Sequence, residues 1–234
     1  MHKEVRACML PVLVAISGIL GGCASTAEIS QETGGIVRAQ WEQLDGAPTC
    51  CADYQVGDFI PAAADGLKLN LDPGKARNFE SGKSYFVGVE LAALKGAPML
   101  VIKSHQNLPR RNGLPYVVRP SYVVLDEGLG EISGGIDVPL CYARGWGERE
   151  TGYFGVIQLD ESRSWGVVFH TSSSSRGTFV KYSGNATTAG GGAVVEASVN
   201  YSFPAAPVGE LEVLPLTDHM RSYLEKKCPQ LLNK

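Results

Sequence analysis

The sequence predicts an all-β protein, an antiparallel β-sandwich or jelly-roll-like fold with a short C-terminal helix. Three observations favour this class. Apolar and polar residues alternate with a period of two in Leu67–Leu71, Tyr85–Leu91 and Val195–Phe203, which is typical of strands with one buried face. Less regular β-rich runs fill the middle of the chain. Glycine (28 residues) and proline (13 residues) recur at about strand length and supply turns.

The individual elements follow from local patterns. The middle strands are expected at 99–103, 116–118, 122–125, 153–159 and 165–171. Residues 36–44 fit a short helix or a first strand, and the spacing of their apolar residues favours the helix. The segments 171–178 and 184–192 are rich in Gly, Ser and Thr, and we expect mobile hairpin loops there.

The C-terminal helix is expected over 217–227. Met220, Tyr223 and Leu224 fall on one helical stripe, and Thr217 or Asp218 suits the N-cap position. Basic residues at positions 226 and 227 complement the helix dipole in the last turn. Cys228 follows directly and is placed to pin the helix to the sheet.

The N-terminus has the features of an export signal. A basic start precedes an apolar run from Met9 to Leu20, which is shorter than the roughly 20 residues that a spanning helix needs. Leu20-Gly21-Gly22-Cys23 resembles the bacterial lipobox, in which the thiol is acylated and becomes the new N-terminus. The sequence therefore predicts a signal peptide (1–22), a tether (23–35) and one β-sandwich domain (36–234). The alternative is an ordinary secretory signal, cut near Cys23.

An acylated Cys23 would attach the protein to a membrane surface. Ala24 and Ser25, rather than an acidic residue, follow the cysteine, which resembles outer-membrane sorting in Gram-negative bacteria. Removing Lys3, Glu4 and Arg6 with the signal changes the formal charge from −3 to −4. A weakly acidic chain without a basic cluster argues against nucleic acid as a partner.

Four cysteines remain after the signal and Cys23 are set aside, namely Cys50, Cys51, Cys141 and Cys228. An even number in an oxidising compartment favours two disulfides. A bond between adjacent cysteines strains the peptide, so we expect Cys50 and Cys51 to pair with Cys141 and Cys228, in either order. Such bonds would close loops of roughly 90 and 180 residues. A metal or redox role is the alternative, but the chain lacks Cys-x-x-Cys spacing.

Short motifs resemble the maltose operon periplasmic protein (MalM-like) family. Cys50-Cys51 precedes Asp53-Tyr54, and then comes the stretch Phe79-Glu80-Ser81-Gly82-Lys83-Ser84-Tyr85-Phe86. The stretches 119–126 and 207–213 also agree, so that the resemblance covers about residues 48–216. It implies an envelope location and a link to maltose or starch uptake, without catalytic residues. Gly82-Lys83-Ser84 is not a phosphate loop, because no glycine precedes it at the required spacing and no helix follows.

No catalytic or metal-binding motif stands out. The mature histidines are His105, His170 and His219, and none belongs to a His-x-His, a His-Glu-x-x-His or a Gly-x-Ser-x-Gly pattern. The carboxylate pairs 126–127 and 160–161 flank expected turns, where acidic residues are ordinarily solvated. We therefore expect no catalytic residues, no metal and no cofactor. A hydrolase with residues brought together in space is the lesser alternative.

A binding module fits the sequence better than an enzyme. Sugar sites on β-sandwiches use aromatic faces with amide or carboxylate groups beside them. The candidates are Trp146 with Tyr142, Arg144 and Glu148, and separately Trp165. Either tryptophan can instead fill the core or cap its edge. The hypothesis is a lipid-anchored periplasmic accessory protein that binds a maltodextrin-like glycan. The alternative is an envelope scaffold that contacts another protein without a small-molecule ligand.

Overall fold

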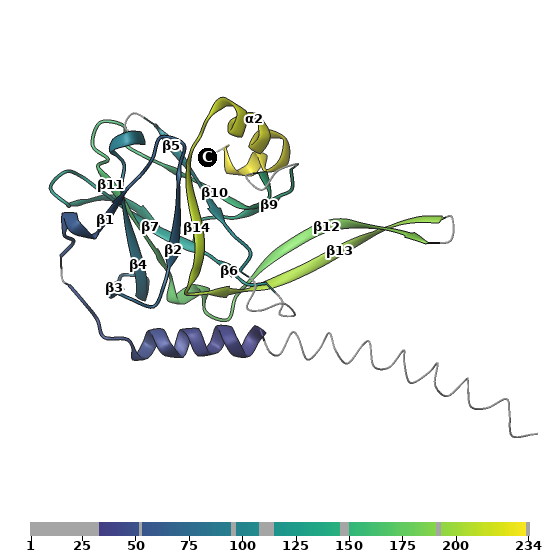
Figure 1. The fold of residues 1–234 in the computed structure, drawn as a ribbon, viewed down its shortest axis with the longest axis horizontal. Coiled ribbons are helices and arrows are strands. Elements are labelled where there is room, and N and C mark those ends of the chain that lie inside the picture. Colours follow the sequence, from purple (N-terminus) through teal and green to yellow (C-terminus); the bar gives the residue numbers. More distant parts are fainter. Residues whose placement is uncertain are drawn as a thin grey trace, which may run out of the picture.

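Two large β-sheets lie face to face and enclose the main core, which confirms the all-β, sandwich-like class (Figure 1). The computed structural model describes residues 33–51, 53–94, 97–107, 115–145, 150–190 and 193–232, and for 182–190 and 193–201 it describes the backbone. The core between the sheets consists of aliphatic side chains and Phe169, with Leu71 and Leu100 fully buried. Alternation along the strands points these side chains inward.

The first sheet has the order β1-β4-β11-β7-β8. Strand β3 pairs with the beginning of β4 (82–85), and β1 pairs with its end (88–90). Its strands are β1 (Phe59–Pro61), β3 (Ala76–Phe79), β4 (Gly82–Glu90), β7 (Pro120–Leu125), β8 (Glu131–Gly135) and β11 (Gly166–Thr171). The second sheet has the order β2-β14-β5-β10-β9. Its strands are β2 (Leu67–Leu71), β5 (Met99–Ser104), β9 (Cys141–Ala143), β10 (Gly152–Gln158) and β14 (Gly209–Pro215).

Most neighbouring strands are antiparallel, as the sequence predicts, but two pairs are parallel. The short strand β1 runs parallel to β4, with Phe59 opposite Gly88. The two-residue strand β6 (Val117–Val118) runs parallel to the end of β13. Short single-turn 3₁₀ helices lie at Val56–Asp58 (η1), Ala92–Leu94 (η2), Ser173–Ser175 (η4) and Pro229–Leu231 (η5).

The N-terminal helix, residues 33–46, lies along one side of the sandwich (Figure 1). Its buried positions, Thr33, Val37, Trp41 and Leu44, fall three or four residues apart and so share one face. This face packs on Ala76, Tyr85, Ala206 and Val208. The helix expected over 36–44 is confirmed, and it also takes in the last three residues of the expected tether.

Helix α2 (Asp218–Lys227) covers the outer face of the second sheet, which confirms the expected C-terminal helix. The Thr217 side chain caps it by accepting a hydrogen bond from the Met220 backbone N–H. Met220 and Leu224 are buried against Val101 and Phe154. Because alternate residues of β5 face opposite ways, this strand contributes to both the central core and the cluster under α2.

A long two-stranded ribbon projects from the sandwich (Figure 1). It consists of β12 (Phe179–Gly190) and β13 (Ala193–Ala206), paired antiparallel from Phe179 opposite Pro204 to Gly190 opposite Ala193. At its base Val180 and Phe203 pack against Val117 and Tyr153. The expected loop over 184–192 is therefore mostly strand.

The serine-rich segment after β11 forms an ordered turn where the sequence predicts a loop. Ser172 accepts a hydrogen bond from the Ser174 backbone N–H and so caps η4. Ser174 and Ser175 each donate to a different carboxylate oxygen of Asp137, at 2.7 Å. Asp137, which is distant in the sequence, thus accepts hydrogen bonds from serine hydroxyls in the segment for which a loop was expected.

The stretch Gly82-Lys83-Ser84 opens strand β4, which confirms that it is not a phosphate loop. Lys83 donates to the backbone oxygens of Asp45 and Ala47, at the C-terminal end of the N-terminal helix. Ser84 is fully buried, and its Oγ accepts from the Thr171 backbone N–H at 2.7 Å. Each polar side chain of the motif therefore holds a neighbouring element in place.

Candidate functional site

The two aromatic groups proposed for glycan binding lie in different sheets. Trp165 stands just before β11, half-buried, with its ring centroid 4.8 Å from that of Phe59 in an edge-on contact. Tyr142 lies in β9, half-buried, 5.1 Å from the ring of Tyr153. The structure therefore does not join Trp165 and Tyr142 into one site.

The other glycan candidates are placed only in part. Arg144 follows β9 and is exposed. Trp146 and Glu148 lie outside the described residues, as do the signal peptide and Cys23. The glycan roles of Trp165, Tyr142 and Arg144 stay predictions, because half-burial against Phe59 or Tyr153 suits a core edge as well as a binding surface.

The disulfide pairing differs from the one favoured by the sequence. Cys50 is bonded to its neighbour Cys51, and Cys141 is bonded to Cys228 with the Cα atoms 5.9 Å apart. The fold explains the difference. Cys50 is tied to β3 of the first sheet by a hydrogen bond from its N–H to the Ala76 carbonyl, at 2.7 Å. Cys141 and Cys228 instead meet under α2, on the outer face of the second sheet.

The backbone of the bonded pair Cys50–Cys51 has an uncommon conformation at Cys51. Cys51 has a φ of 28°, one of three positive values among the described non-glycine residues. The Cys141–Cys228 bond confirms that Cys228 fixes the terminal helix to the sheet.

The three histidines have different surroundings. His170 is buried, its Nδ1 lies 3.0 Å from the Thr171 carbonyl oxygen, and its ring stacks on Phe79 at 3.8 Å. Burial lowers the pKa of His170 to about 4, so the ring is neutral at neutral pH. His219 on α2 is exposed and lies 3.1 Å from Glu150.

His105 belongs to a polar cluster at the end of β5. Its Nε2 lies 3.3 Å from Glu212 and 3.4 Å from Glu210. Burial and then Lys103 lower the pKa of His105, and the two carboxylates oppose this shift. Within the described residues no serine, threonine or cysteine side chain contacts an imidazole nitrogen, and no group of three metal-ligating side chains comes together.

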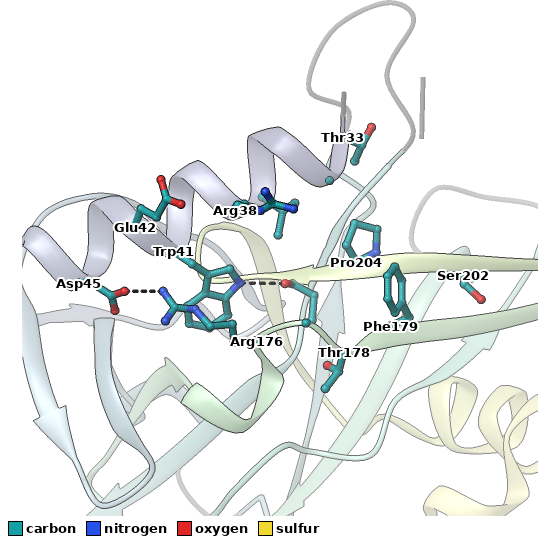
Figure 2. Close-up of a pocket in the computed structure, with 14 residues that line it drawn as sticks. Thr33, Arg38, Trp41, Glu42, Asp45, Arg176, Thr178, Phe179, Ser202 and Pro204 are labelled. Atoms are coloured by element: carbon teal, nitrogen blue, oxygen red, sulfur yellow. Dashed lines mark hydrogen bonds and ion pairs between the residues drawn. The ribbon is translucent and has the colours of Figure 1, made fainter. Parts of the chain in front are cut away.

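A groove between the N-terminal helix and the base of the ribbon is the best-formed candidate site (Figure 2). Its volume is about 530 Å³. The helix contributes Val37 and Trp41 to its lining, the turn before β12 contributes Arg176 and Thr178, and β13 contributes Pro204. We call it the Trp41 groove.

An aromatic ring and an ion pair line the groove. Trp41 is buried, and its indole Nε1 donates to the Ala205 carbonyl at 3.2 Å. The Arg176 guanidinium carbon lies 5.4 Å from the centroid of the Trp41 ring, and Arg176 Nη2 lies 2.6 Å from Asp45 Oδ2. These contacts fix the Arg176 fork between an aromatic face and a carboxylate.

Phe179 supplies an open aromatic face at the same groove. It is 59% exposed, and it is one of four large apolar side chains that are exposed among the described residues. Figure 2 shows it next to Pro204, away from the ion pair of Asp45 and Arg176. An exposed ring beside charged and hydroxyl side chains can stack on an apolar ligand face while polar groups bind the ligand edge.

Sequence reasoning missed this groove because its parts are far apart along the chain. Asp45 and Arg176 are 131 residues apart. The one available signal was Trp41 on an amphipathic helix, and this fits a core position equally well.

Among the described helices, none has both the length and the apolar character needed to cross a membrane. No protein-family model matches the sequence, and no curated protein or solved structure shows significant similarity to it.

Proposed function

We propose that this protein is a lipid-anchored, non-enzymatic accessory protein of the Gram-negative envelope, facing the periplasm, that binds a maltodextrin-like glycan and serves carbohydrate transport. The envelope location rests on the lipobox-like Leu20-Gly21-Gly22-Cys23 and on the resemblance to the MalM-like family. The observation that carries the binding function is that the exposed Phe179 ring lines the same Trp41 groove as the ion pair of Arg176 and Asp45.

The chemistry of the groove supports a sugar ligand. One pyranose face is apolar and stacks on an aromatic ring, whereas its edge carries hydroxyls that both donate and accept hydrogen bonds. Phe179 offers the ring. Arg176 donates and Asp45 accepts, and the Thr178 hydroxyl, which donates to the Ser175 carbonyl at 2.7 Å, can accept. The volume of about 530 Å³ falls in the usual range of small-ligand sites.

Titration with maltodextrins tests the glycan function. Trp41 lines the groove, so ligand entry should change the tryptophan fluorescence. The substitution Phe179→Ala should weaken binding roughly tenfold, because it removes the stacking face. Ile60→Ala is the matched control, since Ile60 is also an exposed apolar residue but lies in β1, outside the groove.

The same titration separates the Trp41 groove from the tryptophans proposed from sequence. Loss of binding in Trp165→Ala or Trp146→Ala, with Phe179→Ala unaffected, would move the site to those residues. If calorimetry and fluorescence detect no maltodextrin at millimolar concentration, the glycan function is wrong. Incorporation of labelled palmitate into the wild type, and not into Cys23→Ser, tests the anchor.

The ribbon of β12 and β13 favours a second candidate function, that of an envelope scaffold. Within the described residues, β13 pairs with a third strand only at Ala205 and Ala206, so both outer edges of the projecting part are open. Open strand edges accept a further strand from another protein. On this alternative, deleting 182–201 abolishes co-purification with an envelope complex, and Phe179→Ala leaves it intact.

A further inference from the structure

A second groove opens at the opposite side of the first sheet, where the turn between β3 and β4 faces β7 and β8. Its volume is about 750 Å³, and it shares no lining residue with the Trp41 groove. Arg77, Phe79 and Ser81 line it from the β3–β4 hairpin, with Val123 from β7 and His170 from β11. We call it the Arg77 groove.

Arg77 is held in place by an aromatic ring and lacks a counter-ion. Its guanidinium carbon lies 3.9 Å from the centroid of the Tyr54 ring and 5.9 Å from that of Phe79. Within the described part of the chain it forms no ion pair, and its Nη1 is buried without a hydrogen-bond partner. A buried charged N–H without an acceptor is costly, so an acceptor supplied by a ligand would stabilise this arrangement.

A second unpartnered atom lies in the same hairpin. The Ser81 Oγ is also buried and forms no hydrogen bond. The Ser81 backbone is fixed, because its carbonyl accepts from the Ser173 backbone N–H at 2.9 Å and from the Ser173 hydroxyl at 2.6 Å. Two polar atoms without partners therefore belong to one hairpin that lines one groove.

The charges around the groove limit the class of ligand. Arg77 is the one cation among the lining residues at neutral pH, because burial keeps His170 neutral. The carboxylates of Glu80 and Glu131 are exposed, where water screens them. Glu131 also accepts from the Tyr54 hydroxyl at 3.4 Å. A guanidinium binds a carboxylate through two parallel N–H donors.

We propose that the Arg77 groove binds a small carboxylate-bearing molecule of about the size of a hexuronic acid, with its carboxylate at Arg77 and Ser81 and its body against Val123. This site is independent of the glycan function. A small movement of the Arg77 side chain brings Nη1 to the ligand oxygen. The Val123 side chain, on the same face of the sheet as His170, then contacts the carbon skeleton of the ligand, as apolar side chains do in mixed polar and apolar sites.

Calorimetry with D-glucuronate, D-glucose and glucose 6-phosphate tests the proposal on the full mature protein. We expect glucuronate to bind, and glucose to bind at least tenfold more weakly because it lacks the carboxylate. Equal binding of glucose, or no binding of glucuronate, overturns the proposal. Tighter binding of glucose 6-phosphate than of glucuronate also overturns it, in favour of a phosphate site.

Variants locate the site. Arg77→Gln should weaken glucuronate binding at least tenfold, and Arg77→Lys should weaken it too, because lysine keeps the charge but loses the two-pronged donor. Ser81→Ala should have a smaller effect in the same direction. Arg176→Gln, in the Trp41 groove, should have none. Unchanged glucuronate binding in Arg77→Gln, with an unchanged melting temperature, contradicts the proposal. Maltodextrin binding is measured in parallel, so that failure of the glycan function is seen separately.

Discussion

Lys103 and Glu212 form an ion pair inside the protein, across the neighbouring strands β5 and β14. The Lys103 Nζ lies 3.5 Å from the Glu212 Oε2, and both side chains are almost fully buried. The two residues are directly opposite in the ladder. Glu212 also lies 3.3 Å from His105, so its carboxylate contacts two basic side chains. Burying charged groups costs free energy, which this mutual pairing offsets.

The ion pair predicts that replacing Glu212 lowers the free energy of unfolding much more than replacing Glu210 does. Glu212→Gln leaves Lys103 buried beside an uncharged amide, and we expect a loss of about 3–5 kcal/mol in the free energy of unfolding. Glu210→Gln is the control, because Glu210 is half-exposed and 3.7 Å from Lys68, so its loss should be about 1 kcal/mol or less. Urea unfolding followed by circular dichroism measures both. Equal losses would contradict this view of the pair.

His170 predicts a fall in stability on mild acidification. Its pKa is about 4 in the folded protein, against about 6.5 when unfolded. Between these values the unfolded chain binds a proton that the folded protein does not, so stability is complete above pH 6.5 and declines as the pH falls to 4. The loss amounts to about 3 kcal/mol at most.

Urea unfolding at pH 7 and pH 4.5 measures the effect of His170. In His170→Phe, which keeps a ring to stack on Phe79, the difference between the two pH values should shrink by most of this amount. A His170→Phe variant with the pH dependence of the wild type would refute the assignment.

The two disulfides should differ strongly in their contribution to stability. Cys141–Cys228 spans 87 residues, and replacing both cysteines with alanine should cost about 4–5 kcal/mol in the chain-entropy model. Cys50–Cys51 joins neighbours, so its bond excludes few unfolded conformations and its removal should cost far less. Guanidinium unfolding of the two double variants gives the comparison. A greater loss from the Cys50/Cys51 variant would contradict the pairing.

Thr217 should contribute a measurable part of the stability of α2. Thr217→Ala removes the oxygen that accepts from the Met220 N–H at 3.2 Å, and we expect a loss of about 1 kcal/mol. Thr217→Ser keeps the oxygen and should be nearly neutral. Thermal unfolding of the three proteins tests this, and an equal loss in both variants would assign the effect to the methyl group instead.

Much of the fold is readable from the sequence because its signals are local. The alternation in Leu67–Leu71 and the stripe with its cap at Thr217 depend on neighbouring residues, and both elements form as expected. The parallel pairing of β1 with β4 was not predictable, since β1 has three residues and no measurable period. The serine turn was misjudged because its partner, Asp137, lies in another segment.

The candidate site was less accessible to sequence reasoning than the fold. Trp165 is a candidate by its residue type alone, and its edge-on contact with Phe59 depends on tertiary packing. The Trp41 groove needs a helix, a turn and a ribbon strand to meet. The disulfide pairing depends in the same way on which sheet each cysteine joins, and no spacing rule contains that information.

The position of the N-terminal helix has a consequence for how the protein works at a surface. Thr33, in its first turn, lines the Trp41 groove, and roughly ten residues connect it to Cys23, which reach at most about 35 Å. On the proposed anchoring, the groove is confined to a thin layer of solvent next to the bilayer. Encounters with molecules leaving a membrane channel would then depend on the local concentration in that layer, and much less on the bulk concentration.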